Sequence, residues 1–247
     1  MSARQRLDTV LHVLGHYATR ARARDAIQRG CVQVAGVPAV KAGQRVSPDD
    51  TITIDDPARA YVSRAGFKLE HALARFGFDA TGHVAVDVGA STGGFTQVLL
   101  AQGAALVHAI DVGQGQLHAS LRDDPRVRLR EGCDARALTA ADLSPPPSVL
   151  VADVSFISLT KVLGVPLSLL VDPRWLVVLV KPQFEVGRAH IGKGGLVTSA
   201  EATTAAVARV RAHIEEHTRW RCSAPFASPL PGGDGNQEWL IGAVYDG

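Results

Sequence analysis

A glycine-rich stretch near the middle of the chain, residues 84–96 with the sequence VAVDVGASTGGFT, constrains the fold more than any other segment. Its alternating valines predict a buried strand, and Phe95, Val98 and Leu99 have the i, i+3, i+4 spacing of a helix face. A strand that enters a helix through glycines lets the backbone approach a ligand closely, beside the free N–H groups at the helix start. The stretch therefore predicts an α/β sheet with a ligand at this turn, with a purely structural turn as the alternative.

The residues around this turn discriminate between classes of ligand. The glycine spacing differs from the dinucleotide-binding fingerprint, and Phe95 stands where a phosphate-binding loop has lysine. Asp87 before the turn suits a cationic ligand better than a polyphosphate. Asp111 follows the next apolar run, at the position where a carboxylate would meet ribose hydroxyls. Together these features favour S-adenosylmethionine over a nicotinamide cofactor or a nucleoside triphosphate.

Strands and helices alternate through the rest of this region, which predicts a mostly parallel sheet covered on both faces. Further strands are expected at residues 104–110, around 127, at 149–152 and at 175–180, with a final pair at 220–226 and 239–245. Helices are expected from a Ser63 cap to about Phe76, from a Ser155 cap to Leu170, and over residues 200–217.

The first quarter of the chain is more basic than the rest. Residues 1–59 carry nine Arg or Lys against six Asp or Glu, whereas residues 60–247 carry seventeen against eighteen. Apolar residues at positions 7, 10, 11 and 14 predict a short helix that ends near Gly15, and Thr19 caps a second helix that closes at Gly30. Short strands follow at 32–34 and 51–54. The arginines of the second helix either contact a phosphate backbone or simply face solvent.

Cysteine usage and hydropathy exclude several other classes of protein. Cys31, Cys133 and Cys222 lie far apart and are odd in number, which suggests free thiols in a cytoplasmic protein. The first residues lack the apolar core of a signal peptide, and the apolar runs at 162–171 and 175–180 are too short to span a bilayer. The histidines are interpreted as lying singly, without the spacing of metal ligands, so neither a metal site nor membrane contact is expected.

Two oppositely charged residues end consecutive predicted strands. Asp153 follows the strand at 149–152, and Lys181 follows the strand at 175–180. Ligands of an open parallel sheet bind outside the carboxyl ends of its strands. Either residue alone could simply mark where solvent begins, but the two together form a candidate acid–base pair.

Two sets of motifs resemble known families. The motifs in the first quarter are RLD at 6–8, TR at 19–20, AI at 26–27, GCVQV at 30–34, Gly36, KAG at 41–43 and Val46. This set resembles the S4-like RNA-binding domain of ribosomal-protein and pseudouridine-synthase relatives. The motifs in the rest of the chain are SR at 63–64, KL at 68–69, DVGASTGGFT at 87–96, DVSF at 153–156, VKPQFE at 180–185 and GNQE at 235–238. This set resembles the TlyA-type ribosomal-RNA 2′-O-methyltransferases, some of which are named haemolysins. The resemblance implies an α+β S4-like domain at residues 1–56, a linker at 57–62, where Pro57 disfavours helix, and at 63–247 an FtsJ-like domain with the Rossmann-like α/β fold of class I methyltransferases.

The resemblance also implies which residues form the site. The Lys-Asp-Lys-Glu tetrad of FtsJ-like enzymes corresponds to Lys68, Asp153, Lys181 and Glu238. S-adenosylmethionine would be held by Asp87, Gly89, Ala90, Ser91, Thr92, Gly93, Gly94, Phe95, Asp111 and Asp134, the last of which is nearly as well explained as a helix cap. The residues expected to contact ribosomal RNA are Arg4, Arg6, Arg20, Arg22, Arg24, Arg64 and Arg188.

Such a tetrad suits methylation of a ribose 2′-hydroxyl, whose proton must leave during attack on a sulfonium methyl group. Lys181 is the expected base, Asp153 and Glu238 orient it, and Lys68 steers the hydroxyl or a phosphate. A base must be a neutral lysine. Positive neighbours lower the pKa of Lys181 and so favour the neutral form, whereas carboxylates raise that pKa, and the sequence leaves open which effect is larger. The family resemblance then implies the substrate: ribosomal RNA, methylated on cytidine, in one or both ribosomal subunits.

Two other functions stand as alternatives. One is a non-catalytic RNA-binding factor for ribosome assembly, against which the complete tetrad argues. The other is a membrane-active haemolysin, which would need a long apolar or strongly amphipathic segment that the sequence does not show.

Overall fold

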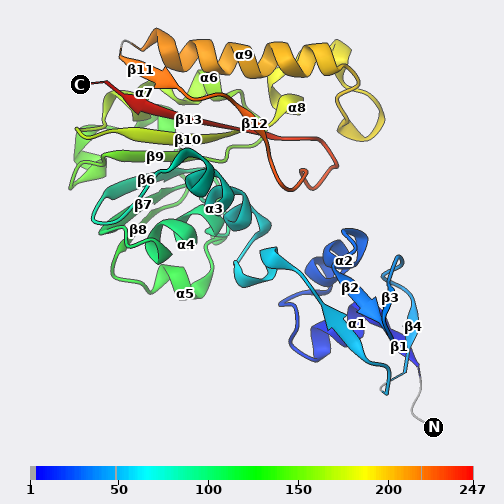
Figure 1. Cartoon of the computed structure of the whole chain (residues 1–247). Helices are drawn as coiled ribbons and strands as arrows, with labels where there is room; N and C mark the ends of the chain where they lie inside the picture. Colours follow the sequence, from blue (N-terminus) through cyan, green and yellow to red (C-terminus); the bar gives the residue numbers. More distant parts are fainter. Residues whose placement is uncertain (1–3, 48, 218, 247) are drawn as a thin grey trace. The chain divides into compact units, whose positions relative to one another are not determined.

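The computed structural model describes residues 4–47, 49–217 and 219–246. The chain folds as two compact units, Met1–Ala60 and Tyr61–Gly247 (Figure 1). Each unit has its own hydrophobic core. Pro57–Ala60 form the 3₁₀ helix η1, although Pro57 was expected to disfavour helix. Proline fits a first helical position, because the N–H that it lacks would have no partner there.

The first unit packs two helices on short antiparallel strands. Leu7 and Leu11 of one helix, Ile27 of the other and Val32 of a strand meet in its core. The strands form the order β3-β2-β5, and β1 pairs with β4. The elements are β1 (Gln5–Arg6), α1 (Leu7–Val13), α2 (Arg20–Gln28), β2 (Val32–Val34), β3 (Val37–Pro38), β4 (Arg45–Val46) and β5 (Ile52–Ile54).

The ends of the two helices test the sequence predictions. Thr19 caps α2 as predicted, since its side chain accepts the N–H of Arg22 at 3.2 Å. Leu14, predicted on the apolar face of the first helix, lies beyond the last residue of α1 and is 61% exposed. The apolar face of α1 is therefore shorter than its periodicity indicates.

A buried carboxylate on α1 holds two arginines of the first unit. Asp8 is 3% exposed and accepts hydrogen bonds from Arg6 at 2.9 and 3.0 Å and from Arg20 at 3.1 Å. The Arg6 hydrogen bonds, helped by Arg20, lower the pKa of Asp8 from 3.8 to about 2. Both arginines, predicted to contact RNA, thus also stabilise the fold, while their side chains remain about half exposed.

Substituting Asp8→Asn should remove an acid-sensitive contribution to the stability of the first unit. The folded-state pKa lies below the ordinary value, so the carboxylate stabilises the fold above pH 3.8, and the contribution disappears as the pH falls towards 2. Its size is about 1–2 kcal/mol. Amide protection of α1 and α2 at about pH 6 and about pH 2 measures it. Wild type should lose more protection in acid than the variant, and equal losses would contradict the assignment.

The second unit is an α/β domain built on an eight-stranded sheet of the described residues, in the order β11-β13-β10-β9-β6-β7-β8, with β12 beside β13. Neighbouring strands from β10 to β8 are parallel, whereas β13 runs antiparallel to β10, β11 and β12. Its strands are β6 (Val84–Val88), β7 (Leu106–Ile110), β8 (Val127–Arg130), β9 (Val149–Ala152), β10 (Trp175–Val180), β11 (Trp220–Cys222), β12 (Phe226–Ala227) and β13 (Trp239–Tyr245). Its helices are α3 (Arg64–Phe76), α4 (Gly94–Ala101), α5 (Ala119–Arg122), η2 (Ala135–Ala137), η3 (Ala140–Leu143), α6 (Leu159–Val162), α7 (Gly164–Ser168), α8 (Pro182–Glu185), η4 (Arg188–His190), η5 (Lys193–Gly195) and α9 (Ala200–Glu216).

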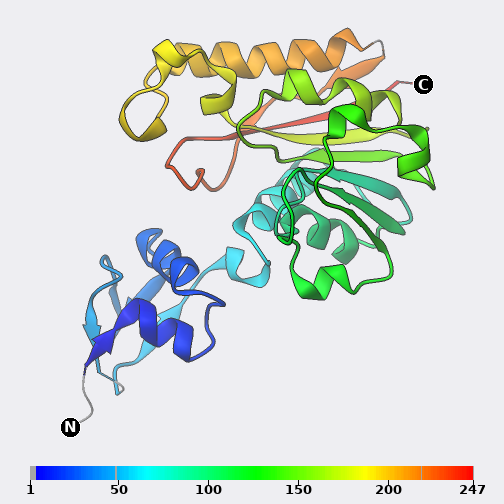
Figure 2. The ribbon, with the colours of Figure 1, turned by 180° about the vertical axis from the view of Figure 1, so that it is seen from behind.

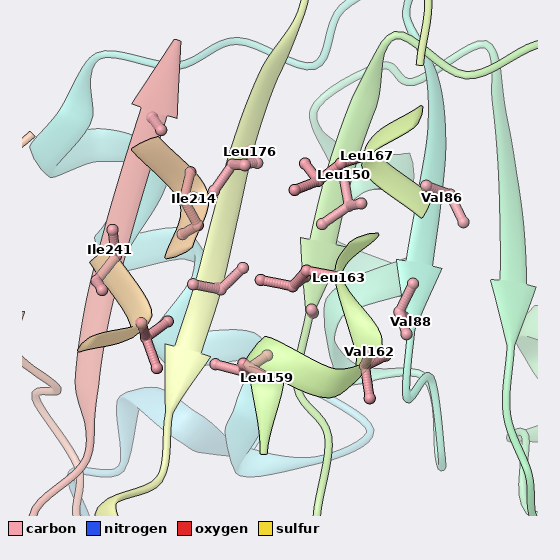
Figure 3. Packing of buried hydrophobic residues seen from close by; sticks show 14 of the residues in the cluster. Val86, Val88, Leu150, Leu159, Val162, Leu163, Leu167, Leu176, Ile214 and Ile241 are labelled. Atoms are coloured by element: carbon pink, nitrogen blue, oxygen red, sulfur yellow. The ribbon is translucent and has the colours of Figure 1, made fainter. Parts of the chain in front are cut away.

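Continuous apolar runs in the central strands explain why helices cover both faces of this sheet. Successive side chains of a strand point to opposite faces. Val149 and Val151 of β9 belong to one core cluster with Leu69 of α3. Leu150 lies beside Leu163 and Leu167 on the other face, in a second cluster that also contains Ile214 of α9 (Figure 3). The views from both sides show α9 running along one face of the sheet and α3 and α4 lying on the other (Figures 1 and 2). The predicted Rossmann-like arrangement is thus confirmed.

The helical segment after β9 departs from its prediction. Ser155 was expected to cap one helix through Leu170, but the cap is Ser158, whose Oγ accepts the Thr160 N–H at 3.2 Å. The segment is divided into α6 and α7. Pro166, in α7, has no N–H to donate to the preceding turn, which accounts for the interruption.

Candidate active site

The carboxyl-terminal edge of the parallel sheet gathers the polar residues singled out in the sequence. Asp111 follows β7, Asp153 follows β9 and Lys181 follows β10. Because β13 is antiparallel to β10, its first residue, Trp239, pairs with Val180 at the end of β10. Glu238 therefore enters the sheet at the same edge as Lys181, where open α/β sheets bind their ligands.

Two ion pairs bring the four predicted catalytic residues together. Lys181 Nζ lies 2.7 Å from Asp153 Oδ1 and donates a hydrogen bond to Ser155 Oγ at 2.8 Å. Lys68 of α3 donates to Glu238 Oε2. All four line one cavity of about 270 Å³. Ser155 was predicted only as a helix cap, so its contact with Lys181 was missed.

The Lys68–Glu238 pair is the more buried of the two. The two side chains are 7% and 3% exposed, so Lys68 lies inside the domain, although lysine side chains are ordinarily exposed. Burial raises the pKa of the Glu238 carboxyl, and the neighbouring Lys68 ammonium opposes that shift. Removing either partner would leave a polar group buried without its counter-charge.

The glycine turn predicted between strand and helix connects β6 to α4. Gly89 has φ +84°, and a Cβ placed on it would lie 2.6 Å from the Asp153 carbonyl oxygen. Gly93, with φ +96°, caps α4. The Phe95 side chain is 2% exposed and belongs to the core between α4 and the sheet, so packing is its main role. Ala90, Ser91, Thr92 and Gly94 line the cavity of about 270 Å³ that holds the predicted catalytic residues, and Gly89 and Phe95 also line it.

A Gly89→Ala substitution should therefore weaken binding of S-adenosylmethionine by about 10- to 100-fold, from backbone strain and displacement of the loop. Isothermal titration calorimetry with the cofactor measures this effect. Gly164→Ala is a matched control, because a Cβ there meets no atom within 4 Å. Unchanged affinity in Gly89→Ala would contradict the placement of the cofactor against this turn.

A second cavity, of about 530 Å³, lies beside the glycine turn. Asp111, Asp134 and Asp153 line it together with apolar side chains such as Ile157 and Val162. Carboxylates suit a cationic donor with ribose hydroxyls, and apolar walls suit an adenine ring, so these residues fit S-adenosylmethionine. Both cavities are lined by Gly89, Ser91, Asp153 and Ser155, which form their shared rim.

Two of the carboxylates predicted to bind the cofactor, Asp111 and Asp134, also have structural roles. Asp111 accepts hydrogen bonds from the N–H groups of Ser91 at 2.8 Å and Gly113 at 2.6 Å, so it shapes the turn itself. Asp134 caps η2 and forms an ion pair with Arg136, the alternative left open by the sequence, and it also lines the cavity.

Asp87 lies beneath the glycine turn rather than at its surface. It is fully buried in β6, and its Oδ2 accepts the Thr96 hydroxyl at 2.7 Å. Burial raises the pKa of Asp87 to about 7. The side chain therefore supports the turn from within the domain and is not itself on the cavity wall.

The arginines predicted to contact RNA have different surroundings. Arg6 and Arg24 line a cleft of about 570 Å³ in the first unit with Lys41, whereas Arg22 donates to the Ala58 carbonyl at 3.4 Å. Arg64 lines the catalytic cavity of the second unit. The other three are Arg4, which is exposed, Arg20, which is paired with Asp8, and Arg188, which is exposed in η4.

Two histidine pairs correct the expectation that the histidines lie singly. His12 and His16 are four residues apart, and so are His213 and His217 on and just after α9, whose rings are 5.2 Å apart. In the described parts of the chain, no three His, Cys, Asp or Glu side chains gather in a way that could hold a metal ion. Within those same parts, every helix is too short or too polar to cross a membrane.

Comparisons with known proteins agree with this geometry. The FtsJ-like methyltransferase family matches residues 61–245, and the S4 domain matches residues 5–52. The chain is 43% identical over 242 residues to the 16S/23S rRNA (cytidine-2′-O)-methyltransferase TlyA of Mycobacterium tuberculosis, covering 98% of this chain and 90% of that protein. It is 32% identical over 210 residues to the 23S rRNA (cytidine-2′-O)-methyltransferase TlyA of Campylobacter jejuni, covering 81% and 79%.

A solved structure extends the likeness to both units. A protein of Streptococcus thermophilus, named as a hemolysin, superposes with a TM-score of 0.75 at 36% identity, covering 99% of this chain and 90% of that chain. Family, relatives and fold therefore agree along nearly the whole length. The chain belongs to the FtsJ-like methyltransferases, as a TlyA-type member with an S4 domain at its amino-terminal end.

Proposed function

We propose that this protein uses S-adenosylmethionine to methylate the ribose 2′-hydroxyl of cytidine in ribosomal RNA. The observation that carries the proposal is the convergence of Lys68, Asp153, Lys181 and Glu238 in a cavity that shares its rim with a cofactor-sized cavity. Residues 1–56 serve as the RNA-binding domain, 57–62 as a linker and 63–247 as the catalytic domain.

When bound, S-adenosylmethionine supplies an electrophilic methyl group on a sulfonium. Lys181 would act as base in its neutral form: it takes the proton of the 2′-hydroxyl as that oxygen bonds to the methyl carbon and the carbon–sulfur bond of the donor breaks. The ammonium so formed is paired with Asp153, and Asp153 and Ser155 hold Nζ in place. Lys68 and Glu238, both buried, line the same cavity, and the Lys68 ammonium steers the incoming hydroxyl or an adjacent phosphate. Holding the oxygen in line with the methyl group supplies much of the rate enhancement.

The substrate is proposed from the relatives and from the first unit. The Mycobacterium tuberculosis protein is named for 16S and 23S rRNA and the Campylobacter jejuni protein for 23S rRNA, both on the cytidine 2′-oxygen. The S4 domain and the basic cleft of Arg6, Arg24 and Lys41 suit an RNA backbone. Folded ribosomal subunits are therefore the proposed substrates.

Mapping of 2′-O-methyl groups on ribosomal RNA from cells with and without this protein tests the proposal. The expected result is at least one 2′-O-methylcytidine that is present only when the protein is present. An unchanged methylation map would contradict it and favour the non-catalytic assembly factor. Leakage of dye from liposomes would instead favour the haemolysin.

A further inference from the structure

The only asparagine of the chain, Asn236, is buried at the end of the loop that precedes β13. Its Nδ2 donates to the Gly195 carbonyl and to Asp234 Oδ2, both at 2.9 Å, and its Oδ1 accepts the Val197 N–H at 2.8 Å. Both amide hydrogens and the amide oxygen are thus used. A carboxylate of the same shape could not donate, so the position requires an amide.

Two of the partners of Asn236, the backbone groups of Gly195 and Val197, lie in a basic segment of residues 188–198, here called the basic flap. Its ends are joined by a bridge between Ile191 and Val197 and by the Thr198 N–H, which donates to the His190 carbonyl at 3.1 Å. Arg188, His190 and Lys193 are its exposed basic residues, and the sequence has no acidic residue from 186 to 200. Such a segment suits the phosphate backbone of RNA.

The same loop supports the catalytic residues. The Asn236 carbonyl accepts the Gly232 N–H at 2.8 Å, and a Cβ on Gly232 would lie 2.7 Å from Glu238 Oε1, so this backbone packs directly against the catalytic carboxylate. Asp234 Oδ2 also accepts a hydrogen bond from the side-chain amide of Gln183 at 3.0 Å, and Gln183 lies two residues beyond Lys181. The segments that carry Glu238 and Lys181 are therefore held to one hydrogen-bonded centre.

We propose that Asn236 is a positioning residue that fixes the basic flap against the segment carrying Glu238, so that RNA seated on the flap presents its ribose to the tetrad. The inference rests on the proposed function for its reaction. Asn236 is not among the residues that line the cofactor cavity, so its loss should affect methyl transfer and not cofactor binding.

Two substitutions break this link from opposite sides. Asn236→Asp keeps the shape but removes both donors and places a negative charge against the Gly195 carbonyl, whereas Val197→Pro removes the N–H that the flap contributes. Each variant should lower the single-turnover rate at saturating ribosomal subunits by about 10- to 100-fold. In each variant, trypsin should cleave the flap after Arg188 and Lys193 faster than in wild type. The affinity of each variant for S-adenosylmethionine should equal that of wild type. Thr204→Ala, which loses an exposed hydrogen bond on α9, should match wild type in all three measurements.

Each result of this experiment decides the inference. Wild-type rate and wild-type cleavage in both variants overturn it, and so does loss of cofactor binding or of the folded second unit, because Asn236 would then be needed for folding rather than positioning. If wild type itself transfers no methyl group to ribosomal subunits, the proposed function fails. The cleavage and cofactor-binding comparisons then still decide whether Asn236 holds the flap.

Discussion

A Lys181→Ala variant should bind S-adenosylmethionine with wild-type affinity and transfer methyl groups about 10²- to 10⁴-fold more slowly, the usual contribution of a general base. Lys181 lies in the catalytic cavity, where Asp153 and Ser155 hold its Nζ, and it does not line the cofactor cavity. Loss of its amine should therefore affect the reaction without affecting cofactor binding. Single-turnover transfer of a labelled methyl group to ribosomal subunits measures the rate, and calorimetry measures the affinity.

The control for this result is another lysine of the same unit. Lys161 is exposed on α6, and Lys161→Ala should leave both rate and affinity unchanged. Normal turnover by Lys181→Ala would remove Lys181 from the mechanism. A joint loss of rate and cofactor affinity would assign it to cofactor binding.

The second large effect concerns the buried pair of Lys68 and Glu238. Glu238→Gln leaves the Lys68 ammonium buried without its counter-charge, which should lower the free energy of unfolding of the second unit by about 3–5 kcal/mol. Lys68→Met should cost less, because burial already raises the pKa of Glu238 and the carboxyl can take up a proton. Both single variants should lose methyl transfer.

The double variant, Lys68→Met with Glu238→Gln, separates stability from activity. It has no unpaired buried charge, so most of the lost stability should return, yet methyl transfer should stay absent because the tetrad is incomplete. Urea unfolding and transfer to ribosomal subunits give the two readouts. A double variant as unstable as the sum of the singles would show that the pair does not couple, and an active one would remove it from the catalyst.

The turn between β6 and α4 could be predicted because its signal is local. Alternating valines, glycines and the spacing of Phe95, Val98 and Leu99 lie within a few residues of each other, and the observed β6 and α4 follow them. The neighbouring positions of Asp153 and Lys181 were also predictable, because strands joined by one helix commonly lie side by side in a parallel sheet.

The pairing of Lys68 with Glu238 could not be predicted from local pattern. The two residues are 170 positions apart, and they meet only because β13 runs antiparallel to β10 and so begins at the catalytic edge. Lysine side chains are ordinarily exposed, so the residue type gives no sign that Lys68 is buried. Family resemblance named both residues without showing that they form a buried ion pair.

Other sites were missed for a similar reason. Asn236 has no periodic or compositional signal, since its role depends on two backbone groups in a loop about forty positions away, at Gly195 and Val197. Ser155 and Ser158 are both possible helix caps by sequence, and only the backbone path after Asp153 decides between them.

A structure of the protein with S-adenosylhomocysteine bound tests the proposed catalytic site most directly. The sulfur should lie at the rim shared by the two cavities, beside Gly89 and Asp153, and should face Lys181 across the catalytic cavity. A product bound elsewhere, or a sulfur turned away from Lys181, would contradict the claim that these four side chains form the catalyst.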